Sequence, residues 1–364
     1  MTKMADLING CTSTLNRKYS AHLQPLHRRA LDSMLACKSQ CGECVVECAH
    51  CCEQRWVALS CGHRACPHCQ INLGEYWFHR QQRKLLPAPY FMVTLTVPAQ
   101  LRKLMWQHQD ILYDVLFRAA AESLKTIARN NHGISIGFTG VLHTHTRRLD
   151  FHPHIHFIVP GGGIVVDKKD GSWMTFKGNY LVNELVLAKI FRAIFLRYLA
   201  DLELDTPQDV PVKWVANIKC VGRGEKALRY LSRYLYRGVV SQNNIQTEHQ
   251  QVRLRYQDSA TKKISYSQYK PEDFVWKLLQ HVLPRGFKRV RDFGFLHPNA
   301  KRKLHQVQAL LKSKINVMTP VKKTPICGYC KQPVAVILVL PKRIPLLFRS
   351  QWVEANIVPQ PLPS

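Results

Sequence analysis

The stretch that decides the fold is Phe151-His-Pro-His-Ile-His-Phe-Ile-Val-Pro-Gly-Gly-Gly163, in which histidines occupy alternate positions ahead of three glycines. Alternation with a period of two is typical of a β-strand, and consecutive glycines end such a strand. Successive strand side chains point to opposite faces, so His154 and His156 project together while Ile155 faces the core. His152 has the same parity, but the proline that follows it can turn it aside.

Two imidazoles spaced in this way can hold one metal ion and leave coordination positions open. Such an open site can polarise a phosphate oxygen as a Lewis acid. The alternative is that these are exposed strand histidines with hydrogen-bonded partners. Three histidines at alternate positions in a strongly basic chain favour the metal site.

The segments around this strand predict an α+β domain. Their order is strand, helix, strand, strand, helix, strand, helix, which is typical of a split βαβ arrangement with an antiparallel sheet and helices mainly on one face. The predicted strands are 90–97, 133–143, 152–159 and 212–220, with a further hairpin in 251–269, and the predicted helices are 75–86, 99–130, 181–199 and 225–237.

Composition divides the chain into four parts. Residues 1–30 carry scattered basic residues and predict a loose arm or short helix, and residues 31–86 hold a cysteine cluster. The α+β domain extends over residues 87–300 and starts at a proline-rich boundary. Residues 301–364 form a basic tail with a lone Cys327-Gly-Tyr-Cys330, which is equally open to a metal or to a tight turn with two free thiols.

Charge narrows the class of partner. The chain has 364 residues, with 52 Lys and Arg against 24 Asp and Glu, and a net charge of +28. Self-repulsion of this size favours a polyanionic partner, whose counterions are released on binding. No apolar run approaches the ~20 residues that span a bilayer, and the N-terminus lacks an apolar signal core. We therefore expect a soluble cytoplasmic protein that binds nucleic acid and no membrane.

Nine of the thirteen cysteines lie between residues 37 and 69. Because disulfides are rare in the cytosol, this cluster predicts metal binding. The knuckles Cys48-Ala-His-Cys51 and Cys66-Pro-His-Cys69 can close a tetrahedral structural zinc site, with Cys61 as a further ligand. One site with surplus ligands and two sites that share the cluster are both open. The remaining candidate ligands are Cys37, Cys41, Cys44, His50, His63 and His68.

A second group of reactive side chains lies on the predicted helix at 225–237. Tyr230 and Tyr234 are four residues apart, so they lie one above the other on one helix face. A phenol becomes a nucleophile when neighbouring cations meet its developing charge, and guanidinium groups also clamp phosphates. The alternative is a helix with core or base-stacking tyrosines and solvated arginines. The arginines on the adjacent stripe are Arg229, Arg233 and Arg237.

The His-hydrophobic-His strand and the helix with Tyr-x3-Tyr together resemble the HUH endonuclease superfamily, and most closely the rolling-circle transposases of the insertion sequence 91 family. The resemblance covers about residues 45–300. Several separate blocks in the right order are more specific than any single motif. The blocks are Ser60-Cys61 with Cys66-Pro-His-Cys69-Gln70, Leu85-Leu-Pro-Ala-Pro-Tyr-Phe91, Phe151 to Gly163, Tyr230-Leu-Ser-Arg-Tyr234 with Arg237, and His281-Val-Leu-Pro-Arg-Gly-Phe-Lys-Arg-Val-Arg291.

This resemblance implies an HUH endonuclease fold over residues 87–300, preceded by a small zinc-binding domain. It implies that His154 and His156 bind Mg²⁺ or Mn²⁺, which polarises the scissile phosphate of single-stranded DNA. Tyr230 or Tyr234 would then attack this phosphate and form a 5′-phosphotyrosine with a free 3′-OH. The other tyrosine could carry a second cleavage, which suits rolling-circle transfer without ATP.

The resemblance also assigns contacts with DNA. The zinc-binding domain and the basic region after His281 would hold the ends of the mobile element, as hairpins or as single strands. HUH sites often use a third metal ligand, for which Glu225 and His281 are weak candidates. Residues 285–314 hold nine Lys and Arg and one acid, and form either a DNA-facing surface or a solvated tail. The DNA-binding residues expected in this region are Lys288, Arg289 and Arg291.

Three functions compete for this sequence. The first is a metal-dependent strand transferase, the second a plasmid-type rolling-circle replication initiator, and the third a zinc-dependent DNA-binding protein without catalysis. Paired strand histidines with paired tyrosines favour an enzyme, because a binding protein needs no such pair. The resemblance favours a transposase over an initiator. We therefore expect a bacterial transposase that associates with the nucleoid when bound to insertion-sequence ends, and a homo-oligomer is left open.

Overall fold

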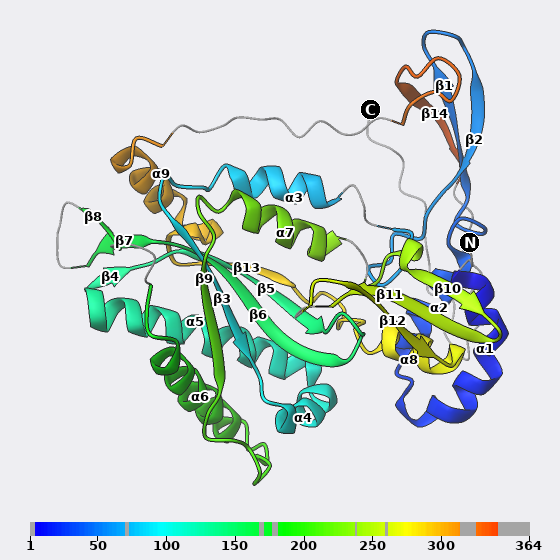
Figure 1. Ribbon diagram of the computed structural model, residues 1–364. Coiled ribbons are helices and arrows are strands. Elements are labelled where there is room, and N and C mark those ends of the chain that lie inside the picture. The colour runs from blue at the N-terminus through cyan, green and yellow to red at the C-terminus, as the bar shows by residue number, and fades with distance from the viewer. Residues whose placement is uncertain are drawn as a thin grey trace, which may run out of the picture.

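The computed structural model describes residues 4–69, 73–166, 171–176, 181–236, 239–258, 261–313 and 325–340, without the side chains of residues 73–76 and 233–236. These residues form a sheet domain, a helical unit beside it and a small cysteine-rich ribbon (Figure 1). Within the described ranges, no helix combines the length and the apolar character needed to cross a membrane.

At the centre is a five-stranded sheet whose strands, in spatial order, are β13 (Val290–Phe293), β5 (Phe138–His145), β6 (Phe151–Pro160), β3 (Tyr90–Thr96) and β9 (Val215–Cys220). Both β3 and β5 pair antiparallel with β6, so they run parallel to each other, and α5 (Gln109–His132) lies between them in the chain. In the same way β6 and β9 both pair antiparallel with β3, with α6 (Glu184–Asp201) between them. Two interleaved split βαβ units result. The predicted α+β fold with an antiparallel sheet is therefore confirmed.

The two faces of this sheet are covered by different helices. On one face, aromatic and aliphatic residues such as Phe91, Leu142 and Phe157 pack against α5 and α6. On the other face, Val141 and Ile158 pack against α3 (Leu73–Gln82) and α7 (Glu225–Tyr236). Figure 1 shows the two helix pairs on opposite sides of the sheet. Helices mainly on one face were expected, and α5 and α6 lie on that face. The other face is also covered, because the apolar side chains of α3 and α7 pack against it.

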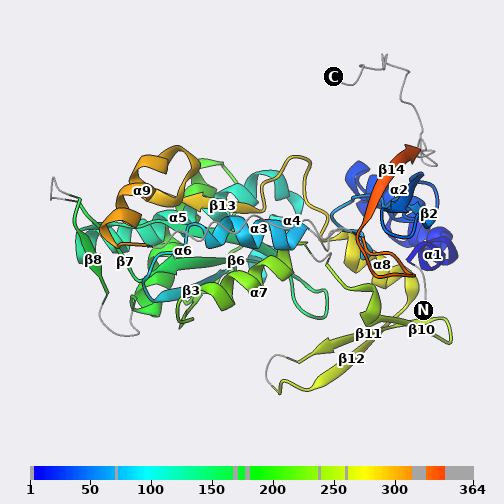
Figure 2. The same cartoon turned by 90° about the horizontal axis from the view of Figure 1, so that it is seen from above.

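The helical unit combines the N-terminal helices with a segment from the second half of the chain. Helix α1 contacts α8, and their buried residues share one apolar cluster with those of α2 and of the adjacent three-stranded sheet. Residues 4–36, most of them expected as a loose arm, thus form two packed helices because α1 buries Met4, Ile8 and Leu15. Figure 2 shows this unit beside the sheet domain, with the β11–β12 hairpin projecting from it. The elements are α1 (Met4–Tyr19), α2 (Pro25–Ala36), α8 (Pro271–Leu279), β10 (Ile245–Glu248), β11 (Gln251–Gln257) and β12 (Ile264–Tyr269).

The cysteine-rich ribbon is a three-stranded sheet in the order β14-β1-β2, in which β14 comes from the expected C-terminal tail. Its strands are β1 (Glu43–Cys48), β2 (Gln54–Ala58) and β14 (Val334–Leu340). The other elements are α4 (Arg102–Gln107), α9 (Lys301–Leu310), the small sheet of β4 (Ile134–Ser135), β7 (Gly162–Val165) and β8 (Trp173–Thr175), and short 3₁₀ helices at Ser20–His22, Ala99–Leu101, Gln242–Asn244, Gly294–Leu296 and Pro298–Ala300.

The structure divides two of the predicted elements. The helix expected over 99–130 breaks at His108, whose φ of −123° and ψ of 46° are not helical. The strand expected over 133–143 splits into β4 and β5. Between β4 and β5 the backbone of Gly137 lies against the Phe295 ring, where a Cβ would stand 2.6 Å from a ring carbon. The edge strand β13, within the basic region, was not predicted because its four residues show no clear alternation.

Candidate active site and metal centres

The register of the central strands places three histidines on one face of the sheet. His154 of β6 lies directly opposite His143 of β5, and His156 lies opposite Val141. Because side chains alternate along a strand, these histidines share the face on which Val141 and Ile158 pack against α3 and α7. His143 was missed in the sequence, although its spacing from His145 repeats the pattern of the neighbouring strand.

The three imidazoles form a compact group. One ring nitrogen of each residue lies within 4.8 Å of those of the others. The ring centroids of His143 and His156 are 4.4 Å apart, those of His154 and His156 4.9 Å, and those of His143 and His154 5.2 Å. Three imidazoles at this spacing can bind one divalent cation and leave its other positions open.

Neighbouring oxygens orient two of these rings. His156 Nδ1 lies 2.8 Å from Thr94 Oγ1, and His154 Nδ1 donates to the carbonyl oxygen of His152 at 2.6 Å. Bonds at Nδ1 leave Nε2 for a metal. Burial lowers the pKa of His154 to about 4 and that of His156 to about 3, and burial also lowers the pKa of His143. The rings are therefore neutral near pH 7, which is the form that binds metal.

The other candidate metal ligands do not join this group. His152 Nδ1 lies 2.6 Å from the guanidinium Nη2 of Arg102. His281 is buried beside His145, with 4.8 Å between ring centroids, and its Nε2 donates to the Leu149 carbonyl oxygen. Glu225, at the start of α7, accepts a bond from Gln82 at 3.4 Å. Among the described residues, the third histidine of the group is therefore His143.

Tyr230 of α7 faces the histidines. Its ring centroid lies 6.5 Å from that of His156, with the two rings perpendicular. Burial raises the pKa of Tyr230, and the positive charge of Arg147 opposes this rise. Tyr230 also lines two cavities, of about 360 Å³ and 580 Å³. A phenol in this position can meet a phosphate that contacts the histidines.

Helix α7 begins where glycine is required. Gly224 has a φ of +83°, and a Cβ there would stand 2.8 Å from the Tyr90 ring. Tyr234 and Arg233 lie on α7 one turn beyond Tyr230 and Arg229, but their side chains, like Arg237, are outside the described residues.

Arg229 points toward α3 instead of toward the histidines. Its guanidinium carbon lies 4.3 Å from the centroid of the Phe78 ring, and Nη2 is 3.9 Å from a carboxylate oxygen of Glu225. The contact with Phe78 holds α7 on α3, whereas the ion pair lies within α7; the DNA-binding role expected from the sequence stays a prediction.

The basic residues after His281 lie along the edge strand β13. Arg289 Nε donates to the Leu142 carbonyl oxygen at 3.0 Å, beside the strand that carries His143. Arg291 pairs with Asp114 and lies over the Phe117 ring. Lys288, Arg289 and Arg291 line a cavity of about 1090 Å³ together with Arg64, Arg80 and Arg285.

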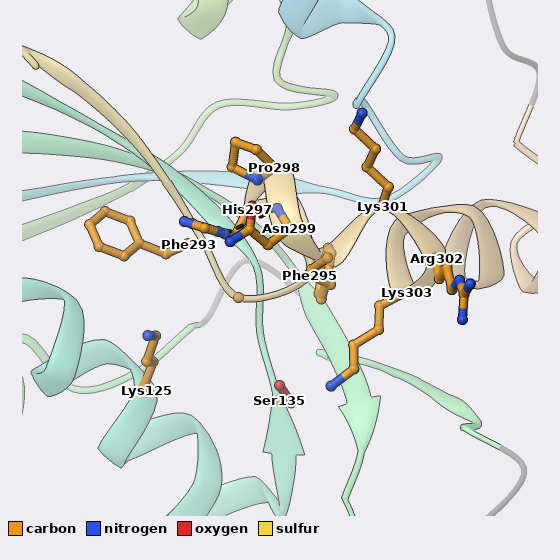
Figure 3. Close-up of a pocket in the computed structure, with 12 residues that line it drawn as sticks. Lys125, Ser135, Phe293, Phe295, His297, Pro298, Asn299, Lys301, Arg302 and Lys303 are labelled. Carbon is orange, nitrogen blue, oxygen red and sulfur yellow. Dashed lines mark hydrogen bonds between the residues drawn. The ribbon is translucent and has the colours of Figure 1, made fainter.

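A second basic cavity adjoins the first and shares Phe293, His297 and Pro298 with it. It measures about 1000 Å³. Figure 3 shows its basic side chains, which come from α5 and from the start of α9: Lys125, Lys301, Arg302 and Lys303. The two cavities adjoin along the β13 edge of the sheet and form a mainly basic surface, with Asp110, Asp114 and Asp292 also in its lining.

The cysteines of the predicted zinc site are divided between two groups of four. One group is Cys37, Cys61, Cys66 and Cys69, and the other is Cys48, Cys51, Cys327 and Cys330. In the first group, Cys69 Sγ lies 3.7 Å from Cys37 Sγ and 3.5 Å from Cys61 Sγ. The knuckles at 48–51 and 66–69 therefore belong to separate groups, because the β1–β2 ribbon carries the first away from the second.

Comparison with known families gives the class of the protein. Residues 8–97 match the family described as "Transposase zinc-binding domain", and residues 137–303 match the family described as "Putative transposase". The first match covers the residues of the first cysteine group, and the second covers all three histidines and Tyr230. The chain is therefore a transposase with an N-terminal zinc-binding domain.

Similarity to individual proteins gives the family. A Sinorhizobium fredii protein, "Putative transposase y4qJ", is 32% identical over 81% of each chain. The transposase for insertion sequence element IS801 of Pseudomonas savastanoi pv. phaseolicola is 27% identical over 66% of this chain and 62% of its own. The chain belongs to the insertion sequence 91 family of transposases. Among solved structures, the conjugative relaxase TrwC in complex with oriT DNA, in a metal-bound form, matches 62% of this chain and 71% of its own with 11% identity and a TM-score of 0.26.

Proposed function

We propose that this transposase nicks and rejoins single-stranded DNA at the ends of an insertion sequence through a covalent 5′-phosphotyrosine. The observation that carries the proposal is the approach of Tyr230 to three neutral histidines, with 6.5 Å between its ring and that of His156. A phenol, a cation site and a basic surface are the groups that phosphoryl transfer requires. A DNA-binding protein without catalysis needs no such set.

The histidines fit a divalent cation by the chemistry of their donor atoms. His143, His154 and His156 would hold it, and two of the rings are oriented through Nδ1 by an oxygen partner. Mg²⁺ prefers oxygen ligands and gives up its waters reluctantly, whereas Mn²⁺ accepts nitrogen ligands more readily, so Mn²⁺ is the better fit of the two expected ions. When bound, the ion would polarise a non-bridging oxygen of the scissile phosphate.

In the proposed reaction, the Tyr230 oxygen loses its proton to solvent and attacks the phosphorus of the scissile phosphodiester. The bond from phosphorus to the 3′ oxygen breaks, and that oxygen takes up a proton to become a free 3′-OH. The 5′ end stays joined to Tyr230. Attack by a 3′-OH reverses the step, so rejoining needs no nucleotide cofactor. Arg147 supports the phenolate, since its charge lowers the pKa of Tyr230 against the effect of burial.

A single strand would cross the site at Tyr230, which lines a cavity on either side. The basic surface along β13 would hold the adjacent DNA through Lys288, Arg289 and Lys303. Contacts of this kind bind phosphates without reading sequence. Tyr234, one turn further along α7, is the candidate for a second cleavage in rolling-circle transposition.

A covalent-adduct assay tests this function. The full chain is incubated with single-stranded DNA carrying the element's ends and with Mn²⁺ or Mg²⁺, and protein linked to DNA is resolved by denaturing electrophoresis. Wild type is compared with Tyr230→Phe, Tyr234→Phe and the double variant. We expect a metal-dependent adduct that Tyr230→Phe reduces or abolishes.

The matched control is Tyr266→Phe, an exposed tyrosine on the β11–β12 hairpin. It should form the adduct like wild type. Absence of any adduct with intact DNA binding and verified ends would contradict the proposal and favour a non-catalytic role. An adduct that persists in the double variant would assign the nucleophile to another residue.

A further inference from the structure

The lone Cys327-Gly-Tyr-Cys330 knuckle meets the N-terminal ribbon. Its two sulfurs converge with those of Cys48 and Cys51, and all four lie within 4.8 Å of one another. Cys48 Sγ is 3.3 Å from Cys330 Sγ, and Cys51 Sγ is 3.7 Å from Cys327 Sγ. With a zinc–sulfur bond of about 2.3 Å, a tetrahedral site separates its sulfurs by about 3.8 Å. The observed spacing is close to that value.

The two knuckles have the same backbone geometry. Cys48 N donates to the carbonyl oxygen of Glu53, and Cys327 N donates to that of Gln332, five residues on in each case. The residue after the second cysteine donates back to the first, from Cys52 to Cys48 and from Lys331 to Cys327.

Those two donor residues also share a left-handed φ, of 57° at Cys52 and 62° at Lys331. A left-handed non-glycine residue is uncommon. Its occurrence at the same place in both turns shows that the C-terminal turn is built like the N-terminal one, and both present two thiols to the same point.

The strands next to the two knuckles join them, with β1 and β2 on either side of the first and β14 after the second. β14 pairs antiparallel with β1 from Cys48 opposite Val334 to Glu43 opposite Leu340. Arg55 of β2 donates to the Ile326 carbonyl oxygen at 3.1 Å. Val46 and Val334 are buried among the cysteines. The contact is thus a shared sheet with its own small core.

We propose that Cys48, Cys51, Cys327 and Cys330 bind a second, structural zinc ion that joins the C-terminal segment to the N-terminal ribbon. Four cysteine ligands close the site and leave no position for a substrate. The family match to a zinc-binding domain ends at residue 97, so it assigns no ligand to the C-terminal segment. This inference does not depend on the proposed nuclease chemistry.

The ion would stabilise a part of the molecule that is weak without it. A two-stranded hairpin such as β1–β2 is marginally stable alone, and a third strand with a metal site compensates for its small core. The site also sets where the C-terminal segment lies. Figure 1 shows α9 at one end of the molecule and β14 at the other, beside β1 in the ribbon.

Metal analysis of the purified full-length chain tests the site. We expect Cys327→Ser/Cys330→Ser to hold one zinc ion fewer per chain than wild type. Cys61→Ser/Cys66→Ser, in the first group, should also hold one fewer. The control is Cys52→Ser, an exposed cysteine in the same turn but outside both groups, which should hold as many as wild type. An equal zinc content in Cys327→Ser/Cys330→Ser and wild type would overturn the proposal.

Alkylation of the wild-type protein gives a test that does not depend on the folding of a variant. In the zinc-loaded chain, we expect Cys327 and Cys330 to resist iodoacetamide while Cys52 reacts. Addition of a strong chelator should make them reactive together with Cys48 and Cys51. If Cys327 and Cys330 react as fast as Cys52 before chelation, or are isolated as disulfides, the zinc site is refuted.

Discussion

Replacement of His143 tests the part of the candidate site that depends most on the tertiary structure. His143 is 1% exposed, and its ring lies 4.4 Å from that of His156. His143→Gln keeps a polar side chain of similar length but removes one of three imidazole ligands. Loss of a residue that merely orients a metal ligand costs about 10–100-fold in affinity or activity. Loss of a direct ligand should therefore raise the Mn²⁺ concentration for half-maximal cleavage by about 100-fold or more, or about 2.7 kcal/mol.

The assay is cleavage of an end-labelled single strand over a range of Mn²⁺ concentrations. The matched control is His145→Gln, because His145 is also buried, lies two residues along the same strand and is outside the group of three. Its metal requirement should stay within about threefold of wild type, whatever its effect on stability. Equal increases in both variants would refute the reasoning, and so would a wild-type metal requirement in His143→Gln.

Three further predictions concern stability and can be measured by thermal unfolding. Burial lowers the pKa of His154 to about 4 and that of His156 to about 3, so the unfolded chain takes up protons at a higher pH than the folded chain. Acid therefore favours unfolding, and Tm should fall as pH drops from 6.5 toward 3. A Tm that rises over this range contradicts the assignment. Asn183 caps α6 by accepting from two backbone amides, so Asn183→Ala should cost about 1 kcal/mol without changing metal-dependent cleavage. Gly294 has a φ of +58°, and a Cβ there would stand 1.8 Å from the Ile136 carbonyl oxygen. Gly294→Ala should therefore unfold at a markedly lower temperature or not fold. A wild-type Tm would contradict the described turn.

The strands and helices around the site follow from local patterns. The predicted strand at 152–159 is β6, at Phe151–Pro160, and the predicted helix at 225–237 is α7, at Glu225–Tyr236. The periodicity of apolar and polar residues predicts these elements because side chains alternate along a strand and repeat every 3.6 residues along a helix, independently of tertiary contacts. The same rule placed His154 and His156 on one face before any partner strand was known.

The third histidine required the register between strands. His143 lies opposite His154 because β5 and β6 pair antiparallel with that alignment, and a shift of one residue would turn it to the other face. In the sequence, the His143-Thr-His145 spacing is typical of a strand, but it does not show that His143, rather than His281 or Glu225, meets the histidine pair. The arrangement of Arg229 on the Phe78 ring is also tertiary, because it depends on where α3 packs against α7.

The sequence by itself determined the family, most of the strands and helices around the candidate site, the charge that favours DNA and the presence of thiol ligands in knuckles. Only the tertiary structure decided how those knuckles combine. Cys48 and Cys51 lie within 21 residues of Cys69 in the chain, yet they share a cluster with Cys327 and Cys330. The physical reason is that the spacing of two cysteines in the sequence decides which thiols one turn presents, whereas strand pairing decides which two turns meet. Here β14 pairs with β1 although most of the chain lies between them in the sequence.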